Sequence, residues 1–329
     1  MSEPAEEAML PLDLSAAANT AALATAGGPD TGLDAVFGRL PSGESCEAQF
    51  GRILRQSIDE VLDGQRTGRF DILDLEKTEK TYLGTKVEII TRAHFSWERG
   101  RHMDYAIAGQ DVDAKFTVGS NWTIPAEAVG HICLLMRAND HKSQFQVGLV
   151  RIREELLNRG QNRDGKKTLS VLGRQAIRWL VPAGALPPNI LLSLTPEARS
   201  AVFMAGGGGR GPRGGQARTN ALFRHVQGRL VDRNTVLTVA SQDDGPKRVR
   251  DSRNHLRGEG IMILGHQNQH PHIARALDLP VPDKGSWIAV KTVRLDPGTE
   301  DSRPVAHIGT GAYAVWREGD AAPQAPESY

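Results

Sequence analysis

The sequence predicts an α/β protein with two domains, the first built on a mixed β-sheet flanked by helices. Two stretches, Ala48–Leu62 and Lys77–His94, carry apolar residues at helical spacing, and later stretches alternate apolar and polar residues as half-buried strands do. A cluster of Pro and Gly beyond residue 181 then interrupts both patterns. With 329 residues and 39% hydrophobic content, the chain is long enough for two domains of ordinary size.

The same patterns set the expected domain boundaries. Residues 1–45 are rich in Ala, Gly, Pro and Thr, so we expect a mostly disordered extension with at most a short helix over Ala16–Ala26. The first domain then covers 46–180, a linker covers 181–189, the second domain covers 190–320, and a disordered tail covers 321–329. The residues that mark the linker are Pro182, Gly184, Pro187 and Pro188.

Four strands and one further helix are predicted to follow the two helices of the first domain. The strands cover His102–Ala108, Asp111–Val118, His131–Arg137 and Phe145–Ile152, and the helix covers roughly Leu169–Leu180.

The first two strands predict a hairpin that gathers charged side chains. Gly109-Gln110 suits a two-residue turn because Gly takes a positive φ, and this turn pairs Ala106 with Asp113 and Asp104 with Lys115. Directly paired residues share one face of a sheet. Two carboxylates beside an ammonium group offer oxygen ligands for Mg²⁺ and a cation near a reacting centre.

A plainer interpretation stays open for each of these residues. Charged cross-strand pairs are common on solvated sheet faces. Glu88, a further acidic candidate, ends the stretch Thr85-Lys86-Val87-Glu88, which fits the capping box of a helix start.

Three short helices and three alternating segments are predicted in the second domain, after a Gly- and Arg-rich loop at Ala205–Gly215. The helices cover Gln216–Gln227, Asp232–Ala240 and Pro246–Leu256, with Asp232 and Asp243 or Asp244 as N-caps; the alternating segments cover Ile261–Leu264, Trp287–Val293 and Ala306–Trp316. Three helices with the basic one last resemble a helix-turn-helix, and the strands suit the wings of a winged helix.

Positive charge is concentrated in this part of the chain. From Arg210 to Arg257 there are eleven Lys/Arg and four Asp/Glu, a net of +7, although the whole chain carries only +1. A local basic region on a nearly neutral protein is typical of a DNA-binding module, and an Arg-rich solvated surface is the alternative. The candidate DNA contacts are Lys247, Arg248, Arg250, Arg253 and Arg257.

Cysteine and histidine usage predicts neither a disulfide framework nor a zinc site. Cys133 lies in an apolar run and is expected to be a buried small hydrophobe, and Cys46 stands alone. His266, His270 and His272 are close together, but they lack a fourth ligand and Pro271 indicates a loop, so we expect a structural or incidental role. Without a secretory signal or an apolar membrane span, a reducing cytoplasm is the expected setting, with no membrane partner.

The order Glu88, Asp104, Asp113-Ala114-Lys115 resembles the active site of the nuclease superfamily that contains most type II restriction endonucleases. Further short sequence motifs narrow the resemblance to the NaeI family of those enzymes, subtype IIE. This resemblance extends from about Cys46 to about Trp316. The motifs include Asp63-Gly64-Gln65-Arg66-Thr67-Gly68-Arg69, Lys77-Thr78-Glu79-Lys80-Thr81, Gly130-His131-Ile132-Cys133-Leu134, Gln242-Asp243-Asp244, Lys247-Arg248-Val249-Arg250 and Ile263-Leu264-Gly265-His266-Gln267. One departure from the superfamily pattern is Met103, which stands where a proline often precedes the first aspartate.

The resemblance implies a restriction-endonuclease-like first domain that cleaves double-stranded DNA with Mg²⁺. Asp104, Asp113, the Ala114 carbonyl and Glu88 would hold the metal, and Lys115 would face the scissile phosphate. It further implies a homodimer that leaves 3′-hydroxyl and 5′-phosphate ends, a palindromic site that is GCCGGC if specificity carries over, a second DNA duplex bound as allosteric effector, and a cognate methyltransferase in the host.

Two other classes remain as alternatives. One is a DNA-binding regulator with a relic nuclease domain, which the complete Glu88/Asp104/Asp113/Lys115 set disfavours. The other is a topoisomerase-like enzyme, which needs a nucleophilic tyrosine. The four tyrosines are Tyr82, Tyr105, Tyr313 and Tyr329, and none has a convincing nucleophilic setting. Asp63-Gly64 resembles a nucleotidyl-lysine ligase motif, but Val61 stands where the lysine would be, so no ligase chemistry is assigned.

Overall fold

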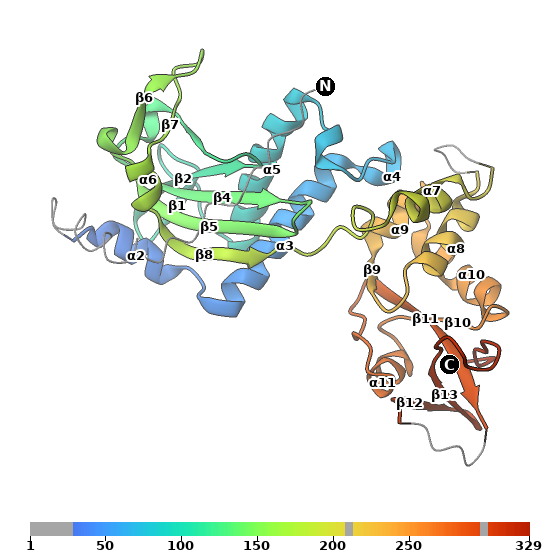
Figure 1. Ribbon diagram of the computed structural model, residues 1–329. Coiled ribbons are helices and arrows are strands. Elements are labelled where there is room, and N and C mark those ends of the chain that lie inside the picture. Colours follow the sequence, from blue (N-terminus) through green and yellow to red (C-terminus); the bar gives the residue numbers. More distant parts are fainter. Residues whose placement is uncertain (1–28, 208–212, 297–301) are drawn as a thin grey trace. The chain divides into compact units, whose positions relative to one another are not determined.

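The computed structural model describes residues 29–207, 213–296 and 302–329, which divide into two compact units. Unit 1 comprises the described residues up to Val61 together with Leu75–Pro188, and unit 2 comprises Leu62–Asp74 together with Asn189–Tyr329. The expected short helix over Ala16–Ala26 lies outside the described residues. Each unit has its own sheet and its own helices (Figure 1).

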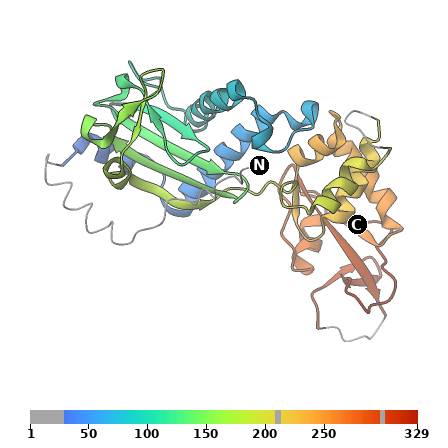
Figure 2. The ribbon, with the colours of Figure 1, turned by 45° about the horizontal axis from the view of Figure 1, so that its top comes forward.

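Unit 1 is built on a five-stranded mixed sheet in the order β1-β2-β4-β5-β8. Its strands are β1 (Tyr105–Ile107), β2 (Gln110–Thr117), β4 (Ile132–Asn139), β5 (Gln144–Arg151) and β8 (Arg178–Ala185). β2 and β4 run parallel, and the other neighbours are antiparallel. The mixed α/β character that the sequence predicts is confirmed (Figures 1 and 2).

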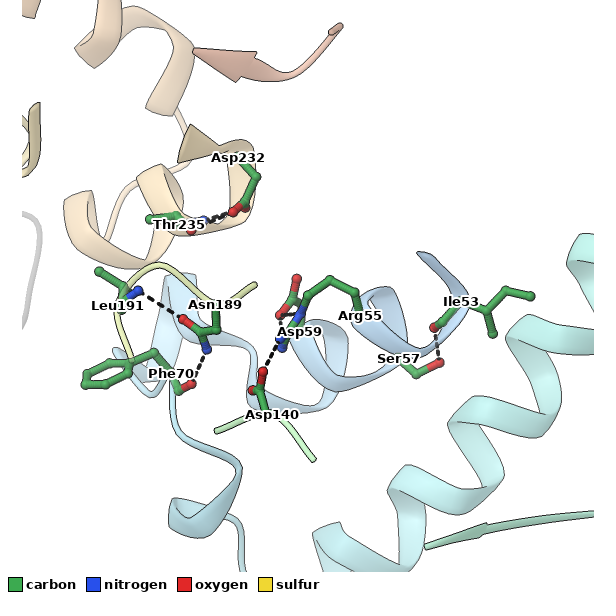
Figure 3. Close-up of polar contacts among 10 residues, drawn as sticks. All are labelled: Ile53, Arg55, Ser57, Asp59, Phe70, Asp140, Asn189, Leu191, Asp232 and Thr235. Carbon is green, nitrogen blue, oxygen red and sulfur yellow. Dashed lines mark hydrogen bonds and ion pairs between the residues drawn. The ribbon is translucent and has the colours of Figure 1, made fainter. Parts of the chain in front are cut away.

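Helices α3 (Gly43–Leu62) and α5 (Lys77–Phe95) cover one face of this sheet. Thr91 of α5 contacts the sulfur of Met136, and Gly51 of α3 approaches the ring of Phe145. Met136 pairs with Val147 and Ala138 with Phe145, so both contacts lie on the same face. Arg55 ties α3 to the end of β4 by bonding Asp140 at 2.5 Å and Asp59 at 2.8 Å (Figure 3).

A second, three-stranded sheet packs on the opposite face. It has the order β3-β7-β6, with β3 (Thr123–Ile124), β6 (Leu157–Gln161) and β7 (Lys167–Leu169). Ile124, Leu157 and Leu169 from its strands join Cys133 and Leu135 of β4 in one buried cluster. The remaining short elements of unit 1 are η3 (Ala126–Ala128), η4 (Glu154–Leu156) and α6 (Val171–Gln175).

The helix expected over about Leu169–Leu180 is wrong in most of its length. Only Val171–Gln175 is helical, capped by Ser170, and the chain then continues as the edge strand β8. Leu169, Leu172 and Ala176 have helical spacing, but pairing of β8 with β5 completes the sheet and overrides that local signal. Pro182, expected in the linker, lies in β8, where an edge position tolerates its missing N–H.

Two described segments, residues 29–45 and 321–329, contain ordered contacts where the sequence indicates disorder. Thr31–Arg39 forms α2, capped by Asp30, and Asp30 is paired with Arg151 at 2.5 Å. In the tail, the Gln324 amide donates to the Thr292 carbonyl. The paired carboxylate of Asp30 anchors the first segment, and hydrogen bonds of Tyr329 to Ile263 and His270 anchor the second, which composition alone does not reveal.

Unit 2 combines a helical layer with a five-stranded antiparallel sheet. The helices are α7 (Pro196–Met204), α8 (Gly215–His225), α9 (Arg233–Ala240), α10 (Gly245–Arg257) and α11 (His270–Ala276). The sheet has the order β10-β11-β13-β12, from β10 (Ile261–Leu264), β11 (Ser286–Leu295), β12 (Val305–Ile308) and β13 (Gly311–Val315), and β9 (Leu230–Asp232) also pairs with β11. Much of the Ala205–Gly215 loop lies outside the described residues.

Leu62–Asp74 is far in sequence from the rest of unit 2 and holds α4 (Gly64–Thr67) and η2 (Ile72–Asp74). Gly64 of α4 meets Thr238 of α9, and Gln65 donates to Asp243. Asn189 fixes the end of this segment by donating to the Phe70 carbonyl at 2.7 Å and accepting from the Leu191 amide (Figure 3). The second compact unit is therefore assembled from two separate parts of the chain.

Candidate active site

The hairpin of β1 and β2 has a different register from the expected one. Ile107 pairs with Gln110 and Ala106 with Asp111, so the turn residues are Ala108 and Gly109 rather than Gly109 and Gln110. Both turn residues have positive φ, 50° and 73°, which is the geometry of a type I′ turn. The expected pairing of Asp104 with Lys115 is therefore wrong, and continuing the observed register places Asp104 opposite Asp113.

The four charged residues nevertheless come together at this hairpin. The Oδ2 atom of Asp104 accepts the Ala114 amide hydrogen at 2.7 Å, and the Lys115 ammonium lies 2.7 Å from Asp113. Asp113 is only 6% exposed, so it does not belong to a freely solvated face of the sheet. A charge buried in this way needs partners, and Lys115 supplies one.

Glu88 reaches the same cluster from α5. It lies inside that helix, whose start is instead capped by a box between Glu76 and Glu79, so the helix-start interpretation of Glu88 is wrong. The Tyr105 hydroxyl donates to the Glu88 carbonyl at 3.0 Å and anchors this turn of α5 beside β1. The Glu88 carboxylate lies 3.5 Å from Arg92.

Two of the acidic side chains are harder to ionise than usual. Burial raises the pKa of Asp104, and the neighbouring Asp113 carboxylate raises it further. Burial likewise raises the pKa of Glu88, with a contribution from the Asp104 charge, although Arg92 and Lys115 oppose it. Carboxylates that repel one another in a partly buried site favour a nearby cation.

The donor set fits a hard divalent cation. The Lys115 ammonium bonds both Asp113 and the Ala114 carbonyl, at 2.7 and 3.2 Å, and these are two of the oxygen groups predicted as metal ligands. These two oxygen groups therefore already stabilise one positively charged group, the Lys115 ammonium. Within residues 29–207, 213–296 and 302–329, no three or more His, Cys, Asp or Glu side chains form a ready-made metal cluster.

Cys133 adds a thiol to the wall of the site. It is buried, as predicted, and pairs with Asp113 across the β2–β4 ladder, with its sulfur 3.6 Å from the Asp113 carboxylate. Burial raises the pKa of this thiol well above its ordinary value, and the Asp113 charge acts in the same direction. Cys133 therefore remains a neutral weak donor to Asp113. Cys46 is also buried and not disulfide-bonded.

The five candidate DNA-contacting cations on α10 differ in whether their side chains already bond other protein groups. Lys247 and Arg250 are exposed. Arg248 is paired with Asp244 at 3.0 Å, Arg253 donates to the Ile263 carbonyl at 2.8 Å, and Arg257 donates to the Glu327 carbonyl at 2.7 Å.

The side chain of Asn254 is exposed on the same helix face as Lys247 and Arg250, since the three positions follow helical spacing. The sequence interpretation considered only cations and did not include Asn254. The opposite face, with Val249, Ser252 and Leu256, is buried. Asp232 caps α9 by accepting from the Thr235 amide, as predicted (Figure 3).

The three clustered histidines do not converge on one point. His270 is buried; its Nδ1 accepts the Gly265 amide hydrogen at 3.0 Å and its Nε2 lies 3.1 Å from the Tyr329 carbonyl. His266 and His272 are exposed. His270 therefore holds the C-terminal residue in place.

The tyrosines offer little for covalent chemistry. Burial raises the pKa of Tyr105 well above its ordinary value and also raises that of Tyr329, so neither phenol is activated. Tyr329 accepts the Ile263 amide hydrogen at its hydroxyl. In the part of the chain that the structure describes, no helix has the length and apolar character to cross a membrane.

Comparison with known proteins connects this site to a family. The family model for restriction endonuclease NaeI matches residues 39–324. The chain is 43% identical over 303 residues to the type II restriction enzyme NaeI of Lentzea aerocolonigenes, which covers 91% of this chain and 94% of that protein.

Proposed function

Because this chain belongs to the NaeI family of type II restriction endonucleases, and is thus a site-specific deoxyribonuclease, we propose that Glu88, Asp104, Asp113 and Lys115 form its cleavage centre. The observation that carries the proposal is the convergence of these residues from α5 and the β1–β2 hairpin, with Asp113 buried against the Lys115 ammonium. Buried charges held together in this way are typical of catalytic centres.

Type II restriction endonucleases generally use divalent metal ions, and we propose Mg²⁺ here. Asp104, Asp113, the Ala114 carbonyl and Glu88 are its proposed ligands, because they are hard oxygen donors. When bound, Mg²⁺ supplies positive charge that stabilises the reacting phosphate.

The protein side chains supply the rest of the chemistry. The Lys115 ammonium faces the scissile phosphate and the attacking water, where its charge lowers the cost of removing a proton from that water. Asp113 orients the ammonium through their 2.7 Å contact. The Asp104–Ala114 bond fixes the first carboxylate, so that the charges are arranged before DNA arrives. The products are a 3′-hydroxyl and a 5′-phosphate.

Unit 2 is proposed to be a winged-helix DNA-binding domain. Its consecutive helices α8, α9 and α10 and the antiparallel strands after them support this, as does the exposed basic face of α10. Lys247 and Arg250 are the proposed direct DNA contacts. Arg248, Arg253 and Arg257 are proposed to support the DNA-bound form from the same helix, since each already bonds a protein oxygen.

We further propose that the enzyme acts as a homodimer on two duplexes, one cleaved and one bound by unit 2 as allosteric effector. The proposed recognition site is the palindrome GCCGGC, supported by the extended identity to the Lentzea enzyme. We also propose that the enzyme acts in the cytoplasm. A cognate DNA methyltransferase is proposed in the host, because an active restriction enzyme requires that the host DNA be protected from cleavage.

The test is cleavage of a sequenced plasmid by the purified protein, with and without Mg²⁺, followed by mapping of the fragment ends. We expect Mg²⁺-dependent cleavage at GCCGGC and no cleavage by Asp113→Ala or Lys115→Ala, each of which should still bind DNA. Glu44→Ala, an exposed carboxylate of α3, serves as the control and should cleave normally. Full cleavage by Asp113→Ala would overturn the centre, and ends mapped at another sequence would overturn the proposed site alone.

A further inference from the structure

The β6–β7 hairpin of unit 1 carries positive charge that the cleavage centre does not use. From Asn158 to Thr168 it has four Lys/Arg and one Asp, a net of +3. Arg159, Arg163 and Lys166 are exposed, whereas Lys167 is paired with Glu154 at 2.8 Å. Among the ion pairs of the described residues, the one on this hairpin is Lys167–Glu154, and none involves Arg159, Arg163 or Lys166. Unpaired cations gathered on one hairpin favour an anionic partner.

The hairpin is a shaped element with a fixed tip. β6 and β7 are paired, and the side-chain oxygen of Asn162 accepts hydrogen bonds from the backbone amides of Asp164 and Lys166, at 3.0 and 2.9 Å. Gly165 supplies the positive φ of 73° that the turn needs. The backbone therefore presents Arg159 and Arg163 at defined positions, which lowers the entropy lost when they bind a partner.

This hairpin stands on the face of the central sheet that carries the cleavage centre. Leu157 and Leu169, at its base, pack in one buried cluster with Cys133. Cys133 is the β4 partner of Asp113 and contacts its carboxylate. The opposite face is covered by α3 and α5, as shown by the contact of Thr91 with Met136. A duplex held at Asp113 would therefore lie on the same side of the sheet as the hairpin.

We infer that the β6–β7 hairpin enters a groove of the duplex being cleaved and contributes to its base specificity. A two-stranded ribbon fits the DNA major groove, which is about 12 Å wide. Guanidinium groups suit guanine, because they bond its O6 and N7 atoms together, and an ammonium suits phosphate. Arg159 and Arg163 are assigned to guanine edges and Lys166 to a phosphate. The inference rests on the proposed cleavage centre, which fixes the side of the sheet that DNA approaches.

The experiment measures kcat/KM on a cognate duplex and on duplexes with single base-pair changes. Arg159→Ala and Arg163→Ala should each lower kcat/KM on the cognate duplex by about tenfold to a hundredfold and reduce discrimination at one position. Arg163→Lys, which keeps the charge but loses the paired bonds, should retain DNA affinity while discrimination falls. Lys166→Ala should weaken binding to all sequences alike, with a shallower dependence on salt.

Arg52→Ala is the matched control, because Arg52 is an exposed arginine of α3 on the opposite face of the sheet. It should leave both kcat/KM and discrimination unchanged. Thermal unfolding of every variant checks that the hairpin change has not disturbed the fold. Unchanged discrimination in both arginine variants would overturn the inference. Normal cleavage by Asp113→Ala would instead overturn the proposed centre, so the two failures are distinguishable.

Discussion

The ammonium of Lys115 lies 2.7 Å from the Asp113 carboxylate, two residues away on the same strand, and also bonds the Ala114 carbonyl between them at 3.2 Å. A single side chain thus neutralises a carboxylate that is almost fully buried. Glu88 has a longer ion pair, 3.5 Å from Arg92, and Asp104 accepts a backbone amide hydrogen rather than facing a cation at this distance. Burial raises the pKa values of Asp104 and Glu88. The raised pKa values of Asp104 and Glu88 bear on how the metal-free protein should respond to pH.

The first prediction concerns stability of the metal-free protein. Because the folded pKa of Asp104 is raised above its ordinary value of 3.8, the folded state holds this proton more tightly than the unfolded chain. The stabilisation is complete below pH 3.8 and is lost as pH rises through the raised pKa. Asp104→Asn lacks this titration, so its melting temperature should fall less than that of the original protein as pH rises above 3.8. Parallel pH profiles of the two proteins would contradict the prediction.

The second prediction follows from the same raised pKa values. A divalent cation competes with protons for the ionised Asp104 and Glu88, so the Mg²⁺ concentration needed for half-maximal cleavage should fall as pH rises through their pKa values. Binding of Mg²⁺ should also raise the melting temperature of the original protein and release protons in calorimetry. Asp113→Ala should show a much smaller rise in melting temperature, whereas Glu44→Ala should behave like the original protein. An equal rise in Asp113→Ala would place the ion elsewhere.

The third prediction separates DNA contact from structural support along α10. Lys247→Ala and Arg250→Ala should each weaken DNA binding and reduce the salt dependence by about one ion, because each removes one phosphate contact. Arg253→Ala instead removes a bond to the Ile263 carbonyl and should lower the melting temperature by more than either exposed variant does. Arg275→Ala, an exposed arginine of α11, is the control for charge alone. Affinity is measured in the full chain without divalent cation, over a series of salt concentrations.

The fourth prediction tests the membership of α4 in unit 2. A Cβ atom on Gly64 would lie 2.3 Å from the Thr238 hydroxyl oxygen and 2.6 Å from the Arg69 carbonyl oxygen. Gly64→Ala should therefore destabilise the protein by about 1–3 kcal/mol through overpacking. Gly84→Ala is the matched control: it lies inside α5 with open space around its Cβ, and it should stabilise by about 0.4–1 kcal/mol. Chemical denaturation of both variants measures the difference.

The same packing bears on separating the two units. A fragment of residues 189–329 lacks Leu62–Asp74, and with it the stacking of Phe70 on Phe203 at 5.5 Å and the Gln65–Asp243 bond. We therefore expect this fragment to be less resistant to proteolysis than unit 2 in the full chain. Adding back a peptide of residues 62–74 should restore part of that resistance. No effect of the peptide would mean that the segment contributes little to unit 2.

The β1–β2 hairpin was predicted from the sequence, but its register was not. The alternation of apolar and polar residues was enough to predict that Asp104, Asp113 and Lys115 lie close together, because a hairpin pairs two segments that are adjacent in sequence. The register was wrong because Ala108 adopts a left-handed conformation that its side chain gave no reason to expect. The packing of Leu62–Asp74 with residues beyond 188 had no local signal at all, since it depends on contacts between distant parts of the chain.

The last prediction concerns the effector duplex. If unit 2 binds a second copy of the site and thereby favours the cleaving state, a plasmid with one site should be cut slowly and a plasmid with two sites quickly. A short duplex carrying the site should accelerate cutting of the one-site plasmid. Effector DNA can only activate if it binds the cleaving state more tightly than the idle one.

Linkage gives this prediction a second, independent measurement. If the effector duplex tightens DNA binding at Asp104 and Asp113, then DNA bound there must tighten effector binding by the same factor. Both affinities can be measured in Ca²⁺, without turnover. Lys247→Ala and Arg250→Ala should reduce activation by the added duplex, because they weaken the effector contact, while Arg275→Ala should not. Equal cutting of one-site and two-site plasmids, with no response to added duplex, would reduce unit 2 to a targeting module. The proposed cleavage centre of Glu88, Asp104, Asp113 and Lys115 would stand after that result, because all four residues belong to unit 1.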